Sequence, residues 1–211
     1  MLQNSGFFIS FEGIDGCGKT TQAAWLAEDL AHAGRRVTNT HEPGGTLFGQ
    51  RLREVLLMTA APRTPKAEAL LFAADRAQHV AEVICPALER GDVVICDRFA
   101  DSTRAYQGGG RRLPTDFIET VIQLATGGLE PHLTFLLDLP VREARARLTG
   151  RGGPTSGFDA EDGDFYERVR AKFLTLARAH PTRIYVLDAT QPPDAVHAQV
   201  WEVVGKRLGL F

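Results

Sequence analysis

The sequence predicts an α/β fold in which a parallel sheet of five strands is covered by helices on both faces. Short apolar runs alternate along the chain with segments of helical periodicity, which is typical of strand-helix-strand units. The runs are almost continuously apolar, as expected for strands buried on both faces of a sheet. The length of 211 residues suits one domain, and no repeat or linker divides it, so we expect a single domain over residues 1–211.

Five runs rich in β-forming residues are the predicted strands: Phe7–Glu12, Val37–His41, Val93–Asp97, Leu133–Asp138 and Ile184–Asp188. Apolar residues at three- and four-residue spacing predict helices between them. These helices cover 19–33, a segment around 48–56, 66–90, 101–107, Thr115–Thr126, Val141–Thr149, a segment around 165–176, and Pro193–Leu208. Residues 150–163 are rich in glycine and predict a mobile loop, or lid.

Residues 13–20, between the first strand and the first helix, match the P-loop pattern G-x-x-x-x-G-K-T. Small residues let the backbone wrap around a phosphate, and the helix N-terminus adds partial positive charge. Lys19 is expected to reach the β- and γ-phosphates, and Thr20 to place a hydroxyl on Mg²⁺. A glycine-rich turn that only joins strand to helix is the alternative. The motif predicts a P-loop NTPase-type three-layer fold and an ATP site at Gly13, Ile14, Asp15, Gly16, Cys17, Gly18, Lys19, Thr20 and Thr21.

The composition narrows the classes of function. A formal net charge of -2 argues against a nucleic-acid polymer as the partner, because such binding normally needs a basic surface. No apolar run approaches the length of a membrane span and no N-terminal signal pattern is present, so we expect a cytoplasmic protein. Cys17, Cys85 and Cys96 have neither disulfide-framework nor zinc spacing. Cys17 lies in the P-loop, where the helix terminus could lower its pKa and make the thiol reactive. The alternative is that Cys17 only fills space and has no chemical role.

Polar residues end the predicted strands, at the edge where ligands of such sheets bind. They are Glu12, His41, Glu42, Asp97, Arg98, Asp138 and Asp188. Asp97 can orient Mg²⁺, directly or through water, and Arg98 can hold phosphate oxygens bidentately. An ion pair that closes the strand is the alternative. Because the P-loop lies at the same edge, we favour the functional interpretation, with Thr20 and Asp97 as metal ligands.

The helix predicted over 66–90 has an apolar stripe and an opposite face. At about 100° per residue the stripe contains the following residues, which we expect to face the core: Leu70, Ala73, Ala74, Ala77, Ala81, Ile84 and Leu88. Phe72 and Arg76 lie roughly opposite, and an aromatic plane beside a guanidinium suits a nucleobase. We expect them to bind base rather than support the fold. Periodicity alone favours the simpler interpretation that Phe72 packs on the next segment or on a partner subunit.

Four segments together resemble the thymidylate kinase family. Residues 11–22 resemble its P-loop, residues 42–46 its second motif, and residues 71–77 and 97–111 its substrate motifs. The resemblance extends to Thr190, and segment 97–111 is the most specific part because generic P-loop proteins lack it. The resemblance implies a five-stranded parallel sheet, transfer of the γ-phosphate of ATP to dTMP in nucleotide biosynthesis for DNA synthesis, and a homodimer.

The resemblance also implies individual roles. The positions that match family residues around dTMP are Asp15, Glu42, Pro43, Phe72, Arg76, Arg98, Thr103, Tyr106 and Gln107. Among them, Arg98 matches the arginine that holds the acceptor phosphate, and Asp15 matches an acidic residue that holds the 3′-hydroxyl. Tyr106 matches an aromatic residue against the sugar, and the glycines after it predict a ring presented by a flexible loop. Ala189 and Gln191 resemble part of the family's adenine wall.

Two positions depart from the family pattern near the phosphates. His41 stands where many members have arginine. The lid usually carries an Asp-Arg-apolar-Glu element, but here Gly157 stands where the arginine is expected. Of the nearby Arg145, Arg147 and Arg151, the last lies between glycines, so its backbone could swing toward the phosphates. We therefore predict that Arg151 supplies the lid charge, with an exposed loop arginine as the alternative.

The chemistry can also be argued from the acceptor. The second pKa of a phosphate monoester is about 6, so its oxygen is already anionic at neutral pH and needs no general base. Catalysis then requires positioning and neutralisation by Lys19, Arg98, Mg²⁺ and a lid charge. Two alternatives stay open: a kinase for another nucleoside or nucleotide on the same fold, and a nucleotide-dependent switch or binding module that hydrolyses slowly.

Overall fold

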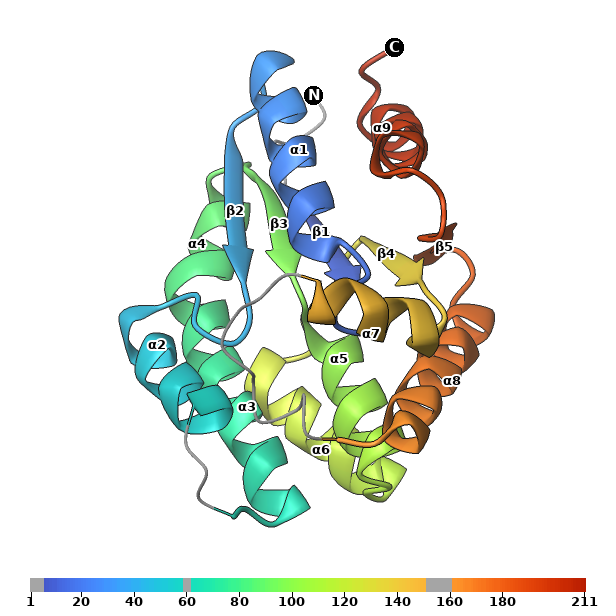
Figure 1. Ribbon diagram of the computed structural model, residues 1–211. Coiled ribbons are helices and arrows are strands. Elements are labelled where there is room, and N and C mark those ends of the chain that lie inside the picture. The colour runs from blue at the N-terminus through green and yellow to red at the C-terminus, as the bar shows by residue number, and fades with distance from the viewer. Residues whose placement is uncertain (1–5, 59–61, 151–160) are drawn as a thin grey trace.

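A twisted parallel sheet lies between two layers of helices in the computed structural model (Figure 1). The structure describes residues 6–58, 62–150 and 161–211. Within these residues the five predicted strands are confirmed: β1 (Phe7–Glu12), β2 (Val37–His41), β3 (Val93–Asp97), β4 (Leu133–Asp138) and β5 (Ile184–Asp188). The strand order is β2-β3-β1-β4-β5, and every neighbouring pair is parallel.

The predicted helices are also present. They are α1 (Lys19–His32), α2 (Leu47–Arg53), α3 (Pro65–His79), α4 (Cys85–Glu89), α5 (Ala100–Thr103), α6 (Thr115–Thr126), α7 (Val141–Thr149), α8 (Gly163–Ala179) and α9 (Pro193–Leu208). The π-helical segments η1 (Glu54–Met58), η2 (Val80–Ile84) and η3 (Arg104–Gly110) directly continue α2, α3 and α5. Because η2 also runs into α4, the long helix predicted over 66–90 is confirmed. In the segments that the structure describes, no helix is long and apolar enough to cross a membrane.

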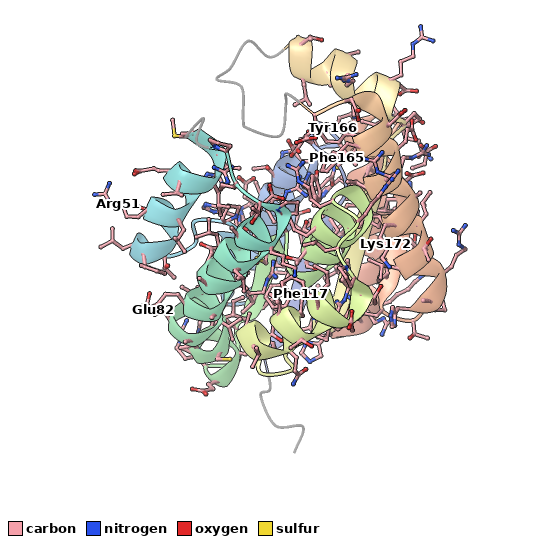
Figure 2. The ribbon with its side chains drawn as sticks, turned by 90° about the horizontal axis from the view of Figure 1, so that it is seen from below. Arg51, Glu82, Phe117, Phe165, Tyr166 and Lys172 are labelled. Atoms are coloured by element: carbon pink, nitrogen blue, oxygen red, sulfur yellow. The ribbon has the colours of Figure 1, made fainter. Side chains whose placement is uncertain are left out.

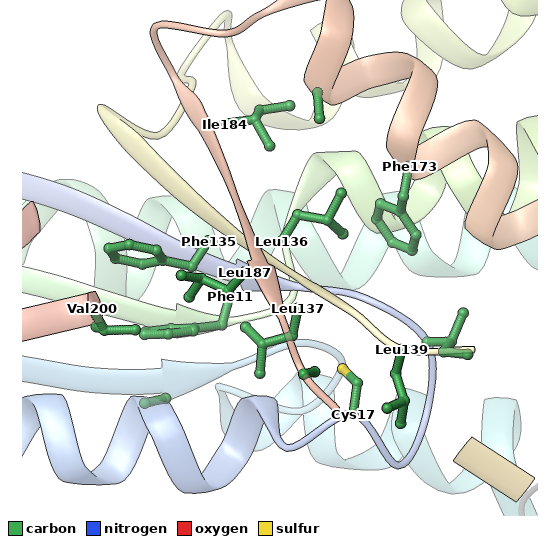
Figure 3. Packing of buried hydrophobic residues seen from close by; sticks show 14 of the residues in the cluster. Phe11, Cys17, Phe135, Leu136, Leu137, Leu139, Phe173, Ile184, Leu187 and Val200 are labelled. Atoms are coloured by element: carbon green, nitrogen blue, oxygen red, sulfur yellow. The ribbon is translucent and has the colours of Figure 1, made fainter. Parts of the chain in front are cut away.

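Each face of the sheet packs against its own helices. On one face α1 and α9 lie together, and Leu30 and Val200 join the same cluster as Phe11 of β1 (Figure 3). On the other face Phe8 of β1 belongs to a cluster with Ile84, next to α4 and α6. Burial of both faces explains why the strands are apolar along most of their length.

The register of the sheet brings polar strand ends to one edge. Phe11 of β1 pairs with Asp97 of β3, and Asp97 pairs with His41 of β2. Glu12, the last residue of β1, pairs with Leu136 of β4. Parallel strands expose their carboxyl ends at the same edge, so these residues and the P-loop gather there.

The prediction that the apolar stripe of the long helix faces the core is wrong for much of its length. Ile84 is buried, but other stripe residues are exposed: Leu70, Ala74, Ala77 and Ala81. The buried face of α3 instead carries charged or polar side chains: Glu68, Asp75, Arg76 and His79. Such groups can be buried where they pair with one another, and hydrophobic periodicity does not recognise a face of this kind.

Candidate active site

The P-loop turns sharply between β1 and α1. Gly13, Gly16 and Gly18 have φ angles of 137°, 84° and 101°, in a region that residues with side chains rarely adopt. A Cβ atom at Gly13 would lie 2.6 Å from the carbonyl oxygen of Leu137. Only glycine therefore lets the loop pass so close to β4 and turn back into α1 at the carboxyl edge of the sheet.

A cavity of about 480 Å³ lies over the P-loop. Its walls include Lys19, Thr20, Asp97 and Arg98. The ammonium of Lys19 donates to the carbonyl oxygen of Ile14 at 3.0 Å, which holds it against the loop. The Thr20 hydroxyl donates to Oδ2 of Asp97, so the two expected metal ligands lie side by side.

The second carboxylate oxygen of Asp97 is suited to a cation. This atom, Oδ1, is buried and meets no hydrogen-bond donor within the described part of the chain. A buried carboxylate oxygen without a partner is costly, and hard cations such as Mg²⁺ prefer oxygen ligands of this kind. The residues at this position therefore fit a magnesium ion.

A neighbouring cavity of about 330 Å³ is lined by Ala189 and Gln191 together with Gly16, Cys17 and Gly18 of the P-loop. Arg147 of α7 lines the same cavity and donates to the carbonyl oxygen of Ala189 at 2.9 Å. Arg147 is thus anchored to the turn that follows β5. The structure brings the expected adenine residues next to the expected phosphate loop.

A separate cavity of about 180 Å³ collects all of the residues expected around the acceptor: Asp15, Glu42, Pro43, Phe72, Arg76, Arg98, Thr103, Tyr106 and Gln107. Sequence reasoning missed Arg53, Leu57 and Ser102, which also line it. Arg53 donates to the carbonyl oxygen of Pro43 at 2.7 Å. The spacing of Arg53 and Leu57, four residues apart on one helical stretch next to the Glu-Pro-Gly turn, is a signal that could have found them.

Arg98 follows β3 and has a φ angle of 75°, which is uncommon for a residue with a side chain. Its Nη2 donates to Asp15 at 2.6 Å and to the Tyr106 hydroxyl at 3.2 Å, and its Nη1 donates to the Gly13 carbonyl at 3.0 Å. Burial alone would raise the pKa of Asp15, but the charges of Arg98 and Lys19 outweigh burial and hold that pKa below its ordinary value. The site therefore contains an ionised Asp15 beside a fixed guanidinium.

Tyr106 is buried, which corrects the expectation of a ring on a flexible loop. It lies in the helical segment η3, and its ring meets those of Phe165, Tyr166 and Phe173 of α8 edge-on at 6.2 to 6.5 Å. Figure 2 shows Phe165 and Tyr166 at the first turn of α8. The glycines that follow Tyr106 continue this helical segment because α8 packs closely against them: a Cβ atom at Gly110 would lie 2.5 Å from the Phe165 ring.

Arg76 is held by three acceptors. It donates to Glu42 at 2.8 Å, to the Thr103 hydroxyl at 2.8 Å and to the Phe99 carbonyl at 3.0 Å, and it is 2% exposed. On its other oxygen Glu42 contacts Nδ1 of His79 at 3.0 Å. The expectation that Arg76 does not support the fold is therefore wrong, because its removal would leave a buried carboxylate without its cation.

Two further expectations near the phosphates are corrected or refined. Burial raises the pKa of Cys17 more than the charge of Lys19 lowers it, so the thiol is not activated by the helix terminus. Figure 3 shows Cys17 next to Leu137 and Leu139, where it packs as a small apolar residue. Burial, assisted by the charge of Arg53, lowers the pKa of His41. A neutral imidazole therefore stands in the cavity where the family pattern has a cation.

Arg151 and Gly157 lie outside the described residues, so the expectation that Arg151 supplies a charge stays a prediction. Of the other two candidates, Arg145 donates to the carbonyl of Glu161 at 3.3 Å, and Arg147 is held at Ala189.

Comparison with known proteins identifies the family of this chain. A family model described as "Thymidylate kinase" matches residues 11–200. The chain is 49% identical to "Thymidylate kinase" of Deinococcus radiodurans over 97% of this chain and 98% of that protein. It is 51% identical to "Thymidylate kinase" of Citrifermentans bemidjiense over 96% and 93%. The crystal structure of thymidylate kinase from Ehrlichia chaffeensis superposes with a TM-score of 0.78 at 36% identity, covering 95% of this chain and 99% of that one. The chain belongs to the thymidylate kinase family, which makes it a phosphotransferase.

Proposed function

We propose that the chain transfers the γ-phosphate of ATP directly to dTMP, giving dTDP and ADP, in the cytoplasmic supply of nucleotides for DNA synthesis. One observation carries the proposal. The cavity over the P-loop and the acceptor cavity share wall residues: Asp15, Glu42, Arg53 and Arg98. Two phosphates, one bound in each cavity, would face each other at this shared wall. That is the arrangement that in-line transfer requires.

The acceptor cavity supports a thymidine nucleotide. Phe72 would stack on the base, and Arg76, fixed by Glu42 and Thr103, would donate to the base edge. Gln107 lines the same cavity, and its amide donates to Glu68 at 3.0 Å. The Tyr106 ring would lie against the sugar, where a 2′-hydroxyl would lose water without gaining a partner. Asp15 would accept from the 3′-hydroxyl.

The donor side supports ATP. The P-loop amides and Lys19 would bind the β- and γ-phosphates, and Ala189, Gln191 and Arg147 would line the adenine. Thr20 and Asp97 would hold a magnesium ion, and the partnerless oxygen of Asp97 supports this assignment. When bound, the ion neutralises charge on the phosphates as transfer proceeds.

The chain's own residues would then position and neutralise. Because the acceptor phosphate is already ionised, no side chain has to remove a proton. Arg98 would hold the acceptor phosphate, and Lys19 would follow the transferring group. Arg151 would add charge from the lid, about 150–163, of the one domain over 1–211. Water exclusion by that lid would favour transfer to dTMP over hydrolysis.

A homodimer through α3 is the assembly we propose. Leu70 is 54% exposed, and Ala74, Ala77 and Ala81 continue the same exposed apolar stripe along the helix. Phe48, on the neighbouring α2, is 50% exposed. An apolar stripe on a surface helix suits a second copy of the same chain, because a two-fold axis lets one helix face meet itself. Leu70→Asp should yield monomers in analytical ultracentrifugation, and an unchanged dimer would exclude this face.

A panel of monophosphates tests the proposed reaction. ADP release is measured with ATP and dTMP, with dUMP, with the ribose analogue of dTMP, with purine deoxynucleotides, and without acceptor. We expect turnover to depend on dTMP. Preference for another monophosphate would indicate a different kinase on this fold, and slow ADP release that ignores the acceptor would indicate a switch.

A further inference from the structure

Glu12 is a buried carboxylate next to the site whose role the reaction does not explain. It ends β1, is 1% exposed, and does not line the acceptor cavity. Burying a carboxylate is costly unless hydrogen bonds and nearby charge compensate it. The contacts of Glu12 show what this residue holds in place.

The first contact extends the pairing of β1 with β3. The Arg98 N–H donates to the carbonyl of Phe11 at 2.9 Å, after which the backbone leaves the sheet through the left-handed conformation of Arg98. The next N–H, that of Phe99, donates to Oε1 of Glu12 at 2.7 Å. A side chain of β1 thus supplies the acceptor for the first amide beyond the turn. This bond fixes the backbone on the far side of the strained residue.

The second contact reaches the guanidinium of Arg98. The Ser102 hydroxyl donates to Oε2 of Glu12, and its oxygen accepts from Nη1 of Arg98 at 3.1 Å. Because the Ser102 hydroxyl is bonded to Glu12, a lone pair of its oxygen is turned toward Arg98. Glu12 therefore acts on both ends of Arg98: on its backbone through Phe99 and on its side chain through Ser102.

Burial and the nearby charge of Asp101 raise the pKa of Glu12 to about 8, while Ser102, Arg98 and Phe99 act in the opposite direction. The group is therefore mostly a neutral acid at neutral pH and a carboxylate above about pH 8, and in both states its two oxygens bond the Phe99 N–H and the Ser102 hydroxyl. Asp101 itself is paired with Arg104 and Arg183, so it leaves Arg98 to Glu12 and Asp15. The carboxylate has a single cationic neighbour among these contacts, and it is the arginine of the site.

We propose that Glu12 is the positioning residue of Arg98, setting its strained backbone through the Phe99 amide and its guanidinium through the Ser102 hydroxyl. The inference rests on the proposed function, in which Arg98 holds the acceptor phosphate. Glu12 touches no substrate. Its effect appears in the kinetics of dTMP and leaves the binding of ATP alone.

The test compares Glu12→Gln, Ser102→Ala, the double variant and Arg98→Ala. Glutamine keeps the size of Glu12 and an acceptor for Phe99, but its amide N–H group cannot accept a hydrogen bond from the Ser102 hydroxyl as the ionised carboxylate does. The variants are therefore compared at about pH 9, above the pKa of about 8 of Glu12. Ser10→Ala is the matched control, because Ser10 is a buried hydroxyl on the same strand whose hydrogen bond, at 2.8 Å, is to Thr134 of β4. For each variant the melting temperature, kcat, and the KM values for dTMP and ATP are measured.

We expect Glu12→Gln to lower kcat/KM for dTMP by roughly 10- to 100-fold, with the KM for ATP near its parent value, since small misplacements of a positioning group have effects of this size. Ser102→Ala should show a smaller fall in kcat/KM for dTMP. The fall in the double variant should be no larger than that of Glu12→Gln, because both residues act along one chain of contacts. Ser10→Ala should lower the melting temperature and leave dTMP kinetics unchanged.

Failure of the inference and failure of the proposed function give different results. If Arg98→Ala loses turnover with dTMP while Glu12→Gln and Ser102→Ala keep the parent constants, Glu12 does not position Arg98 and the proposed function stands. If Arg98→Ala itself keeps the parent constants, the proposed role of Arg98 is wrong, and the role of Glu12 with it. Should Glu12→Gln not fold, Ser102→Ala carries the test, and its unchanged kinetics would overturn the inference.

Discussion

The donor and acceptor sides of the site are built in different ways. The donor side is largely one continuous segment, residues 13–20, whose glycines and backbone make the phosphate loop. The acceptor cavity is assembled from side chains of the P-loop, the turns after β2 and β3, α2–η1, α3 and α5–η3. Several of those side chains are buried and hold one another by ion pairs.

This difference separates chemistry from stability. The Lys19 side chain can be removed with little effect on the core, because it bonds a carbonyl oxygen and a thiol of the loop, whose shape is set by its backbone. A charged side chain of the acceptor cavity cannot be removed in this way, because its removal leaves the charge of its buried partner unpaired. Changes on the acceptor side should therefore affect binding and folding together, and changes on the donor side should affect turnover alone.

Arg76→Ala is the strongest test on the acceptor side. Removing the guanidinium leaves Glu42 buried without its cation, which should lower the free energy of unfolding by about 3–5 kcal/mol. The same change should raise the KM for dTMP. Denaturant unfolding and steady-state kinetics measure the two effects. Ile84→Ala is the control. It opens a cavity in the core, which should lower the free energy of unfolding by about 2–5 kcal/mol, and it should leave dTMP kinetics unchanged. Parent stability in Arg76→Ala would refute the coupling of binding and folding.

Lys19→Ala is the matching test on the donor side. The ammonium contacts the Ile14 carbonyl and the thiol of Cys17, and no carboxylate depends on it among these contacts. Loss of its charge should remove about 3–4 kcal/mol of transition-state stabilisation and lower kcat accordingly. The melting temperature should stay close to that of the parent. Retained turnover in a folded Lys19→Ala protein would show that this loop does not serve the reaction.

Asp75 sharpens the comparison through pH. This side chain is 0% exposed, accepts the Gly44 N–H at 2.9 Å, and has its pKa raised to about 6 by burial and by the charge of Glu42. The folded state then holds the proton more tightly than the unfolded chain, whose pKa is 3.8, so the stability from this group declines as pH rises from about 4 to about 6. Above that range the contribution is constant.

Asp75→Asn removes this titration. Relative to the variant, the parent should lose about 2–3 kcal/mol of unfolding free energy between about pH 4 and pH 6.5. Chemical denaturation at several pH values gives the difference. A difference that grows with pH, or that does not change, would contradict a buried, proton-holding Asp75 beneath the acceptor cavity.

Tyr106→Phe should have the smallest effect. The hydroxyl donates to Asp15 at 3.1 Å and accepts from Arg98 at 3.2 Å, so its loss should weaken kcat/KM for dTMP by about 1 kcal/mol. The ring remains, and with it the preference for dTMP over its ribose analogue. Tyr106→Ala should narrow that preference. Equal preferences in both variants would show that the ring does not read the sugar.

The sequence predicted the strands and the turn at the P-loop closely because their signals are local. The five strands and the turn at Gly13 to Gly18 follow from apolar runs and glycine spacing, and both lie within short windows of the chain. The resemblance to a family supplied the acceptor residues, and the structure gathers them in one cavity.

What the sequence did not predict depends on packing between distant segments. The buried face of α3 is charged because Glu42, 34 residues away from Arg76, supplies its partner. Tyr106 is buried because α8 covers it, although the glycines next to it suggested a loop. Arg53 is anchored at the cavity by its bond to the carbonyl of Pro43, ten residues away. In each case the deciding contact joins residues that no local pattern connects.

Following the transferred phosphorus tests the central claim most directly. ATP labelled at the γ-phosphate is incubated with the enzyme and dTMP, and the label is traced among nucleotide and inorganic products. If the two cavities meet at Arg98 and the phosphoryl group passes directly between them, the label appears in dTDP in step with ADP formation. Label released as inorganic phosphate at the same rate with and without dTMP would contradict the account.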